Sequence, residues 1–193
     1  MKAIQFPISE KEVRALRVGD EVSLSGTVVT ARDAAHKLLV EQNPEFIRPY
    51  LQGSAIYHCG PVMKKERGIW RAAAAGPTTS IREEPYEATV IETYGVRAII
   101  GKGGMGKKTS DALKRFGGVY LHAVGGAAVS IADSIVEVEN VFLLEELGVP
   151  EAFWIFRTKE MKAVVTMDAK GGSLHRNVLA ASQSARDRLL TTR

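Results

Sequence analysis

Two short segments of the chain combine a basic side chain with a turn that exposes backbone N–H groups. Residues 76–82 read GPTTSIR and end at Arg82, and residues 101–106 read GKGGMG and contain Lys102. Free N–H groups next to a cation are what a small polycarboxylate or a phosphate needs from its binding site. The sequence therefore predicts an anionic ligand.

Composition places the chain among ordinary globular proteins. Its 193 residues are 45% hydrophobic and 25% charged, enough for one good-sized core, and 26 Lys plus Arg against 22 Asp plus Glu give only +4. So small an excess does not indicate nucleic acid, and no apolar run approaches the ~20 residues of a membrane span. The start of the chain lacks the apolar stretch of a signal peptide, so we expect a cytoplasmic protein with no membrane partner.

The single cysteine, Cys59, limits the metal chemistry of the chain. One cysteine excludes an internal disulfide framework and cannot by itself hold zinc or an iron–sulfur cluster. We expect no metal ligands in this chain, and Cys59 itself is interpreted as a packed thiol.

Hydrophobic patterning predicts an alternation of strands and helices. Strands are expected at residues 21–30, 54–58, 96–100, 119–124, 136–142, 153–156 and 161–167, with 70–75 ambiguous. Helices are expected at residues 33–40, in the later part of 80–94, at 107–116 and at 127–135. This order favours a layered α/β domain over a helical bundle. Residues 173–193 predict an amphipathic helix on the surface or on a partner.

The helix starts are predicted to lie next to the basic residues. Arg32 sits at a strand-to-helix junction with Asp33 as a candidate cap, and Thr78, Thr79 and Ser80 are candidate caps of the helix that follows residues 76–77. Several free N–H groups are expected at the start of the helix that follows residues 76–77.

Five segments in sequence resemble a known family. They are TARDAAHK at 30–37, IYHCGPV at 56–62, GPTTSIR at 76–82, GKGGM at 101–105 and GGAA at 125–128. Their order and spacing resemble the β subunit, or C-terminal domain, of class I fumarate hydratases and L(+)-tartrate dehydratases. With EAFW at 151–154 and TMDAKG at 166–171, the resemblance runs from about the second strand to Gly172 and leaves the tail unmatched.

The resemblance implies a fold, a cofactor and a set of partners. The implied fold is a three-layer swivelling β/β/α domain, here residues 1–172, followed by a helical tail at 173–193. The implied activity is that of a hydro-lyase whose [4Fe-4S] cluster is held by three cysteines of an α subunit, with the open iron acting on the substrate hydroxyl. This chain would close the active site over that cluster as a homodimer within a heterotetramer.

The resemblance also assigns four residues of the site. Arg32, Arg82 and Lys102 would contact the carboxylates of a dicarboxylate substrate, and Thr78 matches the threonine at the proton that moves; Thr78 and Arg82 are the catalytic assignments. Removing a proton next to a carboxylate places extra negative charge on it, which cations stabilise. An arginine does so with a bidentate fork and a lysine with a compact charge. Whether Thr78 abstracts the proton or positions the substrate is left open, since a hydroxyl is a poor base.

Each assignment has a plainer alternative. The two arginines could form ordinary ion pairs with carboxylates close in sequence, namely Asp33 or Glu41 for Arg32 and Glu83 or Glu84 for Arg82. The threonines could be helix caps, and the glycines around Lys102 could form a tight turn. Among the histidines, His36 is expected to form a structural hydrogen bond, His58 and His122 to lie in the core or an interface, and His175 in the unmatched tail.

One position departs from the family pattern. Ile81 stands where the family usually has glycine before the arginine, and a β-branched residue does not adopt positive φ cheaply, so we expect a helical backbone there or a reshaped pocket wall. If Ile81 faces the pocket, it favours fumarate and malate over a bulkier dihydroxy acid. The preferred interpretation is the β subunit of a fumarate hydratase; the alternatives are a tartrate dehydratase subunit and a non-catalytic anion-binding scaffold.

Overall fold

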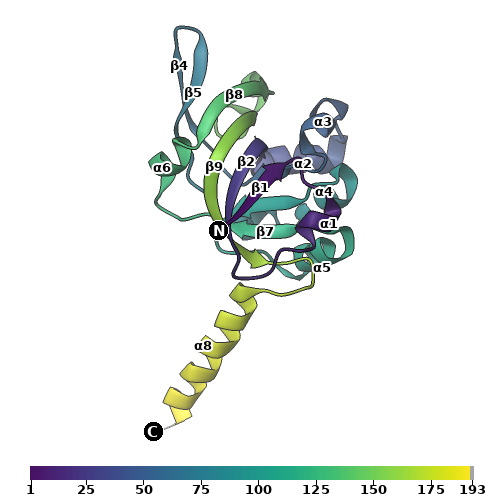
Figure 1. Cartoon of the computed structure of the whole chain (residues 1–193), viewed down its shortest axis with the longest axis vertical. Helices are drawn as coiled ribbons and strands as arrows, with labels where there is room; N and C mark the ends of the chain where they lie inside the picture. The colour runs from purple at the N-terminus through teal and green to yellow at the C-terminus, as the bar shows by residue number, and fades with distance from the viewer. Residues whose placement is uncertain (192–193) are drawn as a thin grey trace.

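A computed structural model describes residues 1–191, and its centre is a parallel sheet (Figure 1). The sheet has the strand order β1-β2-β3-β6-β7, and its strands are β1 (Lys2–Phe6), β2 (Glu21–Thr30), β3 (Ala55–Tyr57), β6 (Ala98–Gly101) and β7 (Val119–His122). The long strand β9 (Phe153–Met167) pairs antiparallel with β7, with β2 and with β8 (Ile135–Phe142). Because β9 contacts both β7 and β2, the strands β2, β3, β6, β7 and β9 form a closed ring.

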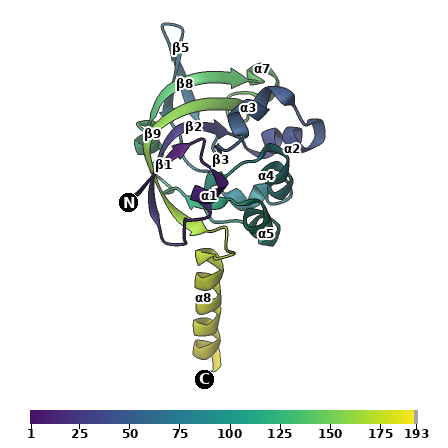
Figure 2. The same ribbon diagram turned by 45° about the vertical axis from the view of Figure 1, so that its right-hand side comes forward.

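Helices cover one side of the parallel sheet, as both ribbon views show (Figure 2). On that side lie α1 (Glu10–Val13), α2 (Asp33–Gln42), α3 (Arg48–Leu51), α4 (Glu87–Tyr94) and α5 (Lys107–Phe116). Two short 3-10 helices, η1 (Glu45–Ile47) and η2 (Ser80–Glu83), precede α3 and α4. The remaining elements are α6 (Ala128–Ala132), α7 (Leu144–Leu147) and a hairpin of β4 (Val62–Glu66) and β5 (Ile69–Ala74).

Two hydrophobic cores flank the parallel sheet. Along β6, Ala98 and Ile100 belong to the core on the β9 side, whereas Ile99 belongs to the core beneath the helices. Successive side chains of a strand point to opposite faces, so a sheet buried on both faces reads as a continuous apolar run. The predicted α/β fold is confirmed, with an antiparallel layer, a parallel layer and a helical layer.

Some predicted boundaries match the structure and others do not. The strand predicted at 21–30 and the helix predicted at 107–116 have the bounds of β2 and α5. The prediction of two strands at 153–156 and 161–167 is wrong, because β9 runs through both. The polar residues between them are on a bulged stretch where the pairing with β2 shifts register and Glu160 has φ +56°.

The predicted cap at Asp33 is wrong, whereas Thr79, one of the three candidates, does occupy a cap position. Arg32 occupies the cap position of α2 and Asp33 is its first residue, while Thr79 occupies the cap position of η2, and neither cap makes a side-chain hydrogen bond. At α2 a distant carboxylate takes over, since Glu151 Oε2 accepts from the N–H of Ala34 at 3.0 Å. At the start of α2, a contact from a residue far away in the chain therefore takes the place of a local cap.

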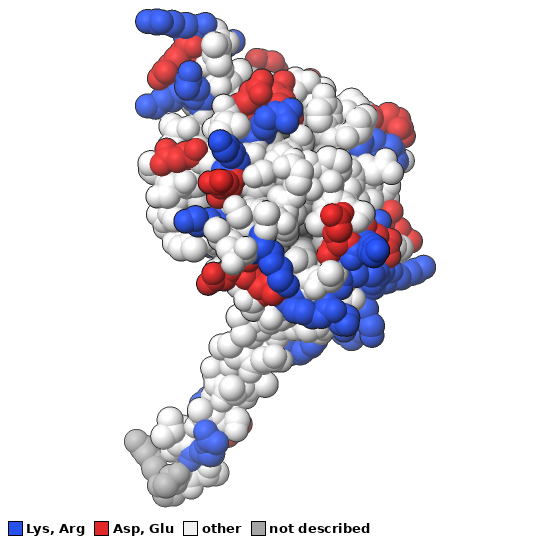
Figure 3. Space-filling view, viewed as in Figure 1, with Lys and Arg blue, Asp and Glu red and all other residues white. Residues whose placement is uncertain are grey.

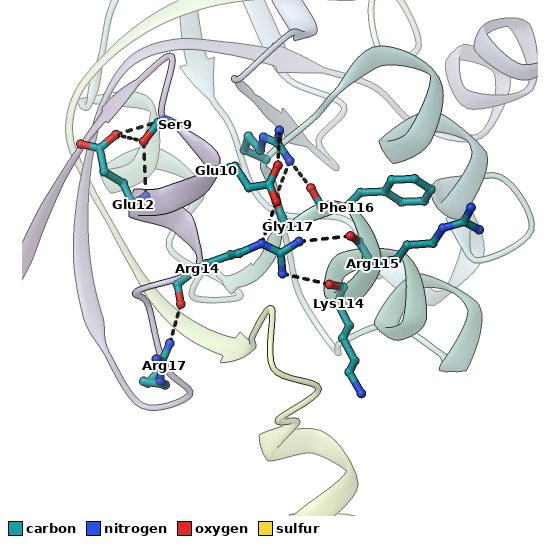
Figure 4. A network of polar contacts seen from close by, with 10 residues as sticks. Ser9, Glu10, Glu12, Arg14, Arg17, Lys114, Arg115, Phe116 and Gly117 are labelled. Carbon is teal, nitrogen blue, oxygen red and sulfur yellow. Dashed lines mark hydrogen bonds and ion pairs between the residues drawn. The ribbon is translucent and has the colours of Figure 1, made fainter.

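Short polar contacts join α1 to the end of α5 (Figure 4). Ser9 and Glu12 form a reciprocal capping box at the start of α1. Arg14 donates to the carbonyls of Lys114 at 3.0 Å and Arg115 at 3.1 Å. The last carbonyls of a helix have no partner within it, so a cation placed there satisfies them and the helix dipole.

The last helix, α8 (Leu174–Thr191), projects away from the body of the molecule (Figures 1 and 2). The predicted tail helix is thus confirmed, but none of its residues is buried. Its middle carries little charge in the space-filling view (Figure 3), and the exposed apolar side chains are Leu174, Val178, Leu179, Leu189 and Leu190. Within residues 1–191, no helix is long and apolar enough to cross a membrane.

Candidate functional site

The predicted site residues come from neighbouring loops at the carboxyl ends of the parallel strands. Arg32 follows β2 by two positions and Lys102 directly follows β6. The loop containing Thr78 lies beside them. The backbone N–H of Thr78 donates to the His58 carbonyl at 2.6 Å, and the Thr78 carbonyl accepts from the Lys102 N–H at 3.3 Å. In both open and closed parallel α/β sheets, ligands bind at this end of the strands.

Both arginines form ion pairs, but not with the predicted partners. The Nε of Arg32 lies 3.5 Å from Glu151 Oε1, and the Arg82 guanidinium contacts the Asp33 carboxylate. Because Asp33 is adjacent to Arg32 in the chain, the two arginines flank the start of α2. The Arg82 side chain is 53% exposed, so this ion pair orients the side chain more than it stabilises the fold.

The chain bends sharply at Gly103 and Gly104, just after Lys102. Gly103 and Gly104 have φ of +85° and +80°, which a residue with a Cβ rarely adopts, so the glycines of this segment serve its backbone path. Gly125, after β7, approaches Lys102, since a Cβ there would lie 3.7 Å from Lys102 Cδ. In the described part of the chain, no carboxylate forms an ion pair with Lys102, so its charge is available to an anion.

Thr78 is half-buried, and among residues 1–191 its hydroxyl has no hydrogen-bond partner. Ile81, as expected, has a helical backbone, because it lies in η2, and its side chain is 50% exposed. The polypeptide therefore turns through residues 78–82 in a way that keeps Thr78 near Lys102 and Arg82 near Asp33.

A fully buried network lies beneath these loops. Glu87 Oε2 accepts from His58 Nε2 at 2.8 Å and from His36 Nε2 at 3.1 Å. The other nitrogen of His36, Nδ1, donates to the carbonyl of Arg32 at 2.9 Å. The network thus joins the loop after β2, the loop after β3 and the start of α4, which are the segments that carry or contact Arg32 and Thr78.

The charges in this network follow from its hydrogen bonds. Burial opposes ionisation of Glu87, but His36 and His58 outweigh it and lower its pKa to about 2. Burial also opposes a charge on His36, yet Glu87 and Glu83 raise its pKa, whereas the pKa of His58 is lowered by burial. Both ring nitrogens of His36 face acceptors, which favours its charged form, whereas Nδ1 of His58 has no partner among the described residues, which favours its neutral form. Two histidines and a carboxylate are also metal-binding types, but one oxygen shared between two ring nitrogens at these distances is a hydrogen-bond arrangement.

Sequence reasoning predicted part of this network. The structural hydrogen bond of His36, the core location of His58 and the burial of Cys59 are confirmed. Glu87 and Glu151 were missed. The available signal for Glu87 was its place at helical spacing before Val90, Ile91 and Tyr94, all buried on α4, where a carboxylate needs a partner.

His175 connects α8 to the glycine-rich loop, which sequence reasoning also missed. Its Nε2 lies 2.9 Å from Thr166 Oγ1, and a Cβ added to Gly104 would come within 2.5 Å of its ring. A cavity of about 570 Å³ opens beside this contact, lined in part by Gly103, Met105 and Leu179. The first turn of α8 therefore packs against the segment that follows Lys102.

Cys59 does not fit the role of a cluster ligand. It is the single cysteine of the chain, its side chain is 1% exposed, and burial raises the pKa of its thiol to about 12. Cluster ligation requires thiolates, and a [4Fe-4S] cluster needs several of them. The residues of this chain therefore do not hold an iron–sulfur cluster.

Comparison with known proteins matches this chain to one family. The family model described as "Fumarase C-terminus" matches residues 2–178, and so extends past both ends of the stretch in which the motifs predicted the resemblance. A putative class I fumarate hydratase of Geobacillus stearothermophilus is 53% identical over 180 residues, which are 93% of this chain and 34% of that protein. This chain thus spans about a third of that relative.

Two further relatives match over most of their own length. A putative L(+)-tartrate dehydratase subunit beta of Methanocaldococcus jannaschii is 41% identical over 174 residues, 89% of each chain. The L(+)-tartrate dehydratase subunit beta of Escherichia coli K12 is 39% identical over 175 residues, 90% of this chain and 86% of that protein. With its fold, its five motifs and these matches, the chain belongs to the family of class I fumarate hydratases and L(+)-tartrate dehydratase β subunits, as a fumarase C-terminal domain.

Proposed function

We propose that the chain is the substrate-clamping β subunit of a hydro-lyase that interconverts fumarate and L-malate. The observation that carries this proposal is the grouping of Arg32, Thr78, Arg82 and Lys102 on adjoining loops at one end of the sheet, with the Lys102 charge unpaired among residues 1–191. The resemblance of the chain to a putative class I fumarate hydratase supports the substrate.

In this proposal the three cations bind the two carboxylates of the substrate. When the proton next to a carboxylate leaves, negative charge grows on that carboxylate, and fixed cations stabilise the transition state more than the ground state. Thr78 lies at the moving proton. Its hydroxyl has no activating partner among the described residues, which favours substrate positioning by Thr78 over proton abstraction unless the partner activates it.

A second subunit completes the enzyme in this proposal. Since Cys59 cannot hold the [4Fe-4S] cluster, we assign the cluster to an α subunit with three ligand cysteines. Two relatives are named as a subunit beta, which supports a partner of this kind. A homodimer of this chain within a cytoplasmic heterotetramer remains part of the same proposal.

Tartrate is the second candidate substrate. Two relatives that match over most of their length are named for L(+)-tartrate dehydratase, which favours this alternative as strongly as the Geobacillus match favours fumarate. A non-catalytic scaffold of the same fold would bind a dicarboxylate without eliminating water from it.

Co-expression with the cluster-bearing subunit tests the proposal. The reconstituted complex is assayed without oxygen on malate and on L(+)-tartrate, using wild type, Arg82→Ala and the exposed-hairpin control Arg71→Ala. We expect malate turnover that is lost in Arg82→Ala while the complex still assembles, and kept in Arg71→Ala. Turnover of tartrate alone would select the second candidate, and full activity of Arg82→Ala would contradict the clamp.

A further inference from the structure

Glu83 is a buried carboxyl group that accepts no hydrogen bond within residues 1–191, at the edge of the candidate site. It directly follows Arg82 in η2, its side chain is fully buried, and no donor of the described chain bonds to either of its oxygens, which lie close to the Asp33 carboxyl group. The nearest cation is His36, whose Nδ1 lies 3.6 Å from Glu83 Oε2. That N–H is already donated to the carbonyl of Arg32.

The groups around Glu83 do not compensate a second negative charge. Asp33 and His36 face it from α2, Glu87 from α4, and Arg82 is its neighbour on η2. His36 already balances Glu87, and Arg82 already pairs with Asp33. Burial, together with Asp33 and Glu87, outweighs His36 and raises the pKa of Glu83 to about 7.

We propose that Glu83 is an affinity-determining residue that binds a proton when a dicarboxylate binds and weakens that binding when it is ionised. Its ionisation would place a negative charge beside the Arg82–Asp33 pair and oppose a dianion held by Arg82. This inference rests on the proposed function of the site as a dicarboxylate clamp. It predicts that dicarboxylate binding depends on pH through a residue of this chain, and not through ionisation of the substrate or of the cluster.

The expected size follows from one charge near the ligand. A negative unit charge a few ångströms beyond the ion pair, at the effective dielectric of a protein surface, weakens the binding of a dianion by roughly three- to tenfold. Glutamine has the shape of a protonated glutamate and no charge. Glu83→Gln is therefore expected to bind a dicarboxylate with the same affinity below and above neutral pH.

The test measures binding of succinate, which has the two carboxylates of malate but no hydroxyl to eliminate. Its Kd for the assembled complex is determined by calorimetry between pH 6.5 and 8.5 for wild type, Glu83→Gln and the exposed control Glu92→Gln on α4. We expect the Kd of wild type and of Glu92→Gln to rise roughly three- to tenfold with pH, and that of Glu83→Gln to stay level.

The outcomes separate this inference from the proposed function. An equal rise of Kd in wild type and Glu83→Gln, a level Kd in both, or no succinate binding at all would overturn the role of Glu83. Malate turnover by the same preparations tests the hydro-lyase independently. The complex could fail to turn over malate and yet show a Kd for succinate that rises with pH in wild type but not in Glu83→Gln. That result would contradict the proposed hydro-lyase activity and support the role of Glu83.

Discussion

Arg82 and Lys102 present their charges to a ligand in different ways. Arg82 is oriented by Asp33 and keeps the rest of its guanidinium exposed, whereas Lys102 is half-buried beside Gly125 with no carboxylate paired to it in the described residues. A fork that is already oriented loses less freedom when it binds a carboxylate than a free lysine would. Arginine at position 82 should therefore matter for more than its charge.

The change Arg82→Lys tests this geometry. We expect kcat/KM of the assembled enzyme to fall by an amount equivalent to about 2 to 5 kcal/mol, because a point charge does not replace two parallel hydrogen bonds in a covered site. Steady-state kinetics on malate measures it, with complex formation checked by gel filtration. Activity within twofold of wild type would mean that the fork is not used.

Glu83 also predicts how stability changes with pH. Its folded pKa of about 7 lies above the ordinary value of 4.5, so between these pH values the folded state binds a proton that the unfolded state has lost. Stability then falls as pH rises through this window, by up to roughly 3 kcal/mol, and levels off above it.

Urea unfolding of the isolated chain checks this effect. At pH 5 the ionisation of Glu83 should make little difference between the unfolding free energies of wild type and Glu83→Gln. At pH 8 the variant should be the more stable of the two. His36, whose folded pKa is raised, contributes stability below its ordinary pKa that is lost as pH rises through the folded value, but it does so in both proteins. Parallel pH curves for the two proteins would show that Glu83 is ionised throughout.

Among the loops, the turn after Lys102 is fixed by a contact from outside the sheet. Gly104 has a positive φ and lies against the ring of His175, at the start of α8. The sequence predicted a glycine-rich turn here but not this contact, because Gly104 and His175 are far apart in the chain. A local pattern identifies the turn, and only the tertiary structure shows what it packs against.

Two alanine substitutions separate backbone strain from this packing. Gly68 has φ +85° and nothing within 4 Å of an added Cβ, whereas the Cβ of Gly104→Ala would meet His175 at 2.5 Å. We expect Gly68→Ala to cost about 1 kcal/mol of unfolding free energy and Gly104→Ala to cost clearly more. Denaturant unfolding measures both, and equal costs would mean that His175 moves aside freely.

The tail helix α8 has the features of a segment that packs on another chain. Most of the stability of a protein helix comes from packing of its apolar face, and five apolar side chains of α8 are exposed. The division into residues 1–172 and 173–193 stays a prediction, although Ser173 is buried and His175 packs on the body. We predict that the rest of the helix contacts the α subunit of the proposed enzyme.

Removing residues 179–193 tests that assignment while keeping His175. We expect the shortened chain to keep the thermal stability of the full chain, because no residue of α8 is buried, and to bind the α subunit more weakly. Co-purification and calorimetry measure the binding, with Leu189→Ala as a milder variant. Unchanged affinity would place the contact on another surface.

Over the whole molecule, the sequence predicted the layers better than the contacts between them. Alternation and turn residues identified β2 and the series β6, α5, β7 and α6, because these are local patterns. The closure of the sheet by β9 could not be predicted from such patterns. Neither could the network of His36, His58 and Glu87, whose members come from three separate segments and share one buried oxygen.

Closure of the ring by β9 also has a consequence for biosynthesis. Val29, near the end of β2, pairs with Ile155 of β9, which the ribosome adds long after β2. Until that part has been made, one side of β2 has unpaired N–H and C=O groups, an edge that invites association between nascent chains. Pairings of such long separation form slowly. The growing polypeptide therefore has to be kept apart from its neighbours until translation has passed residue 167.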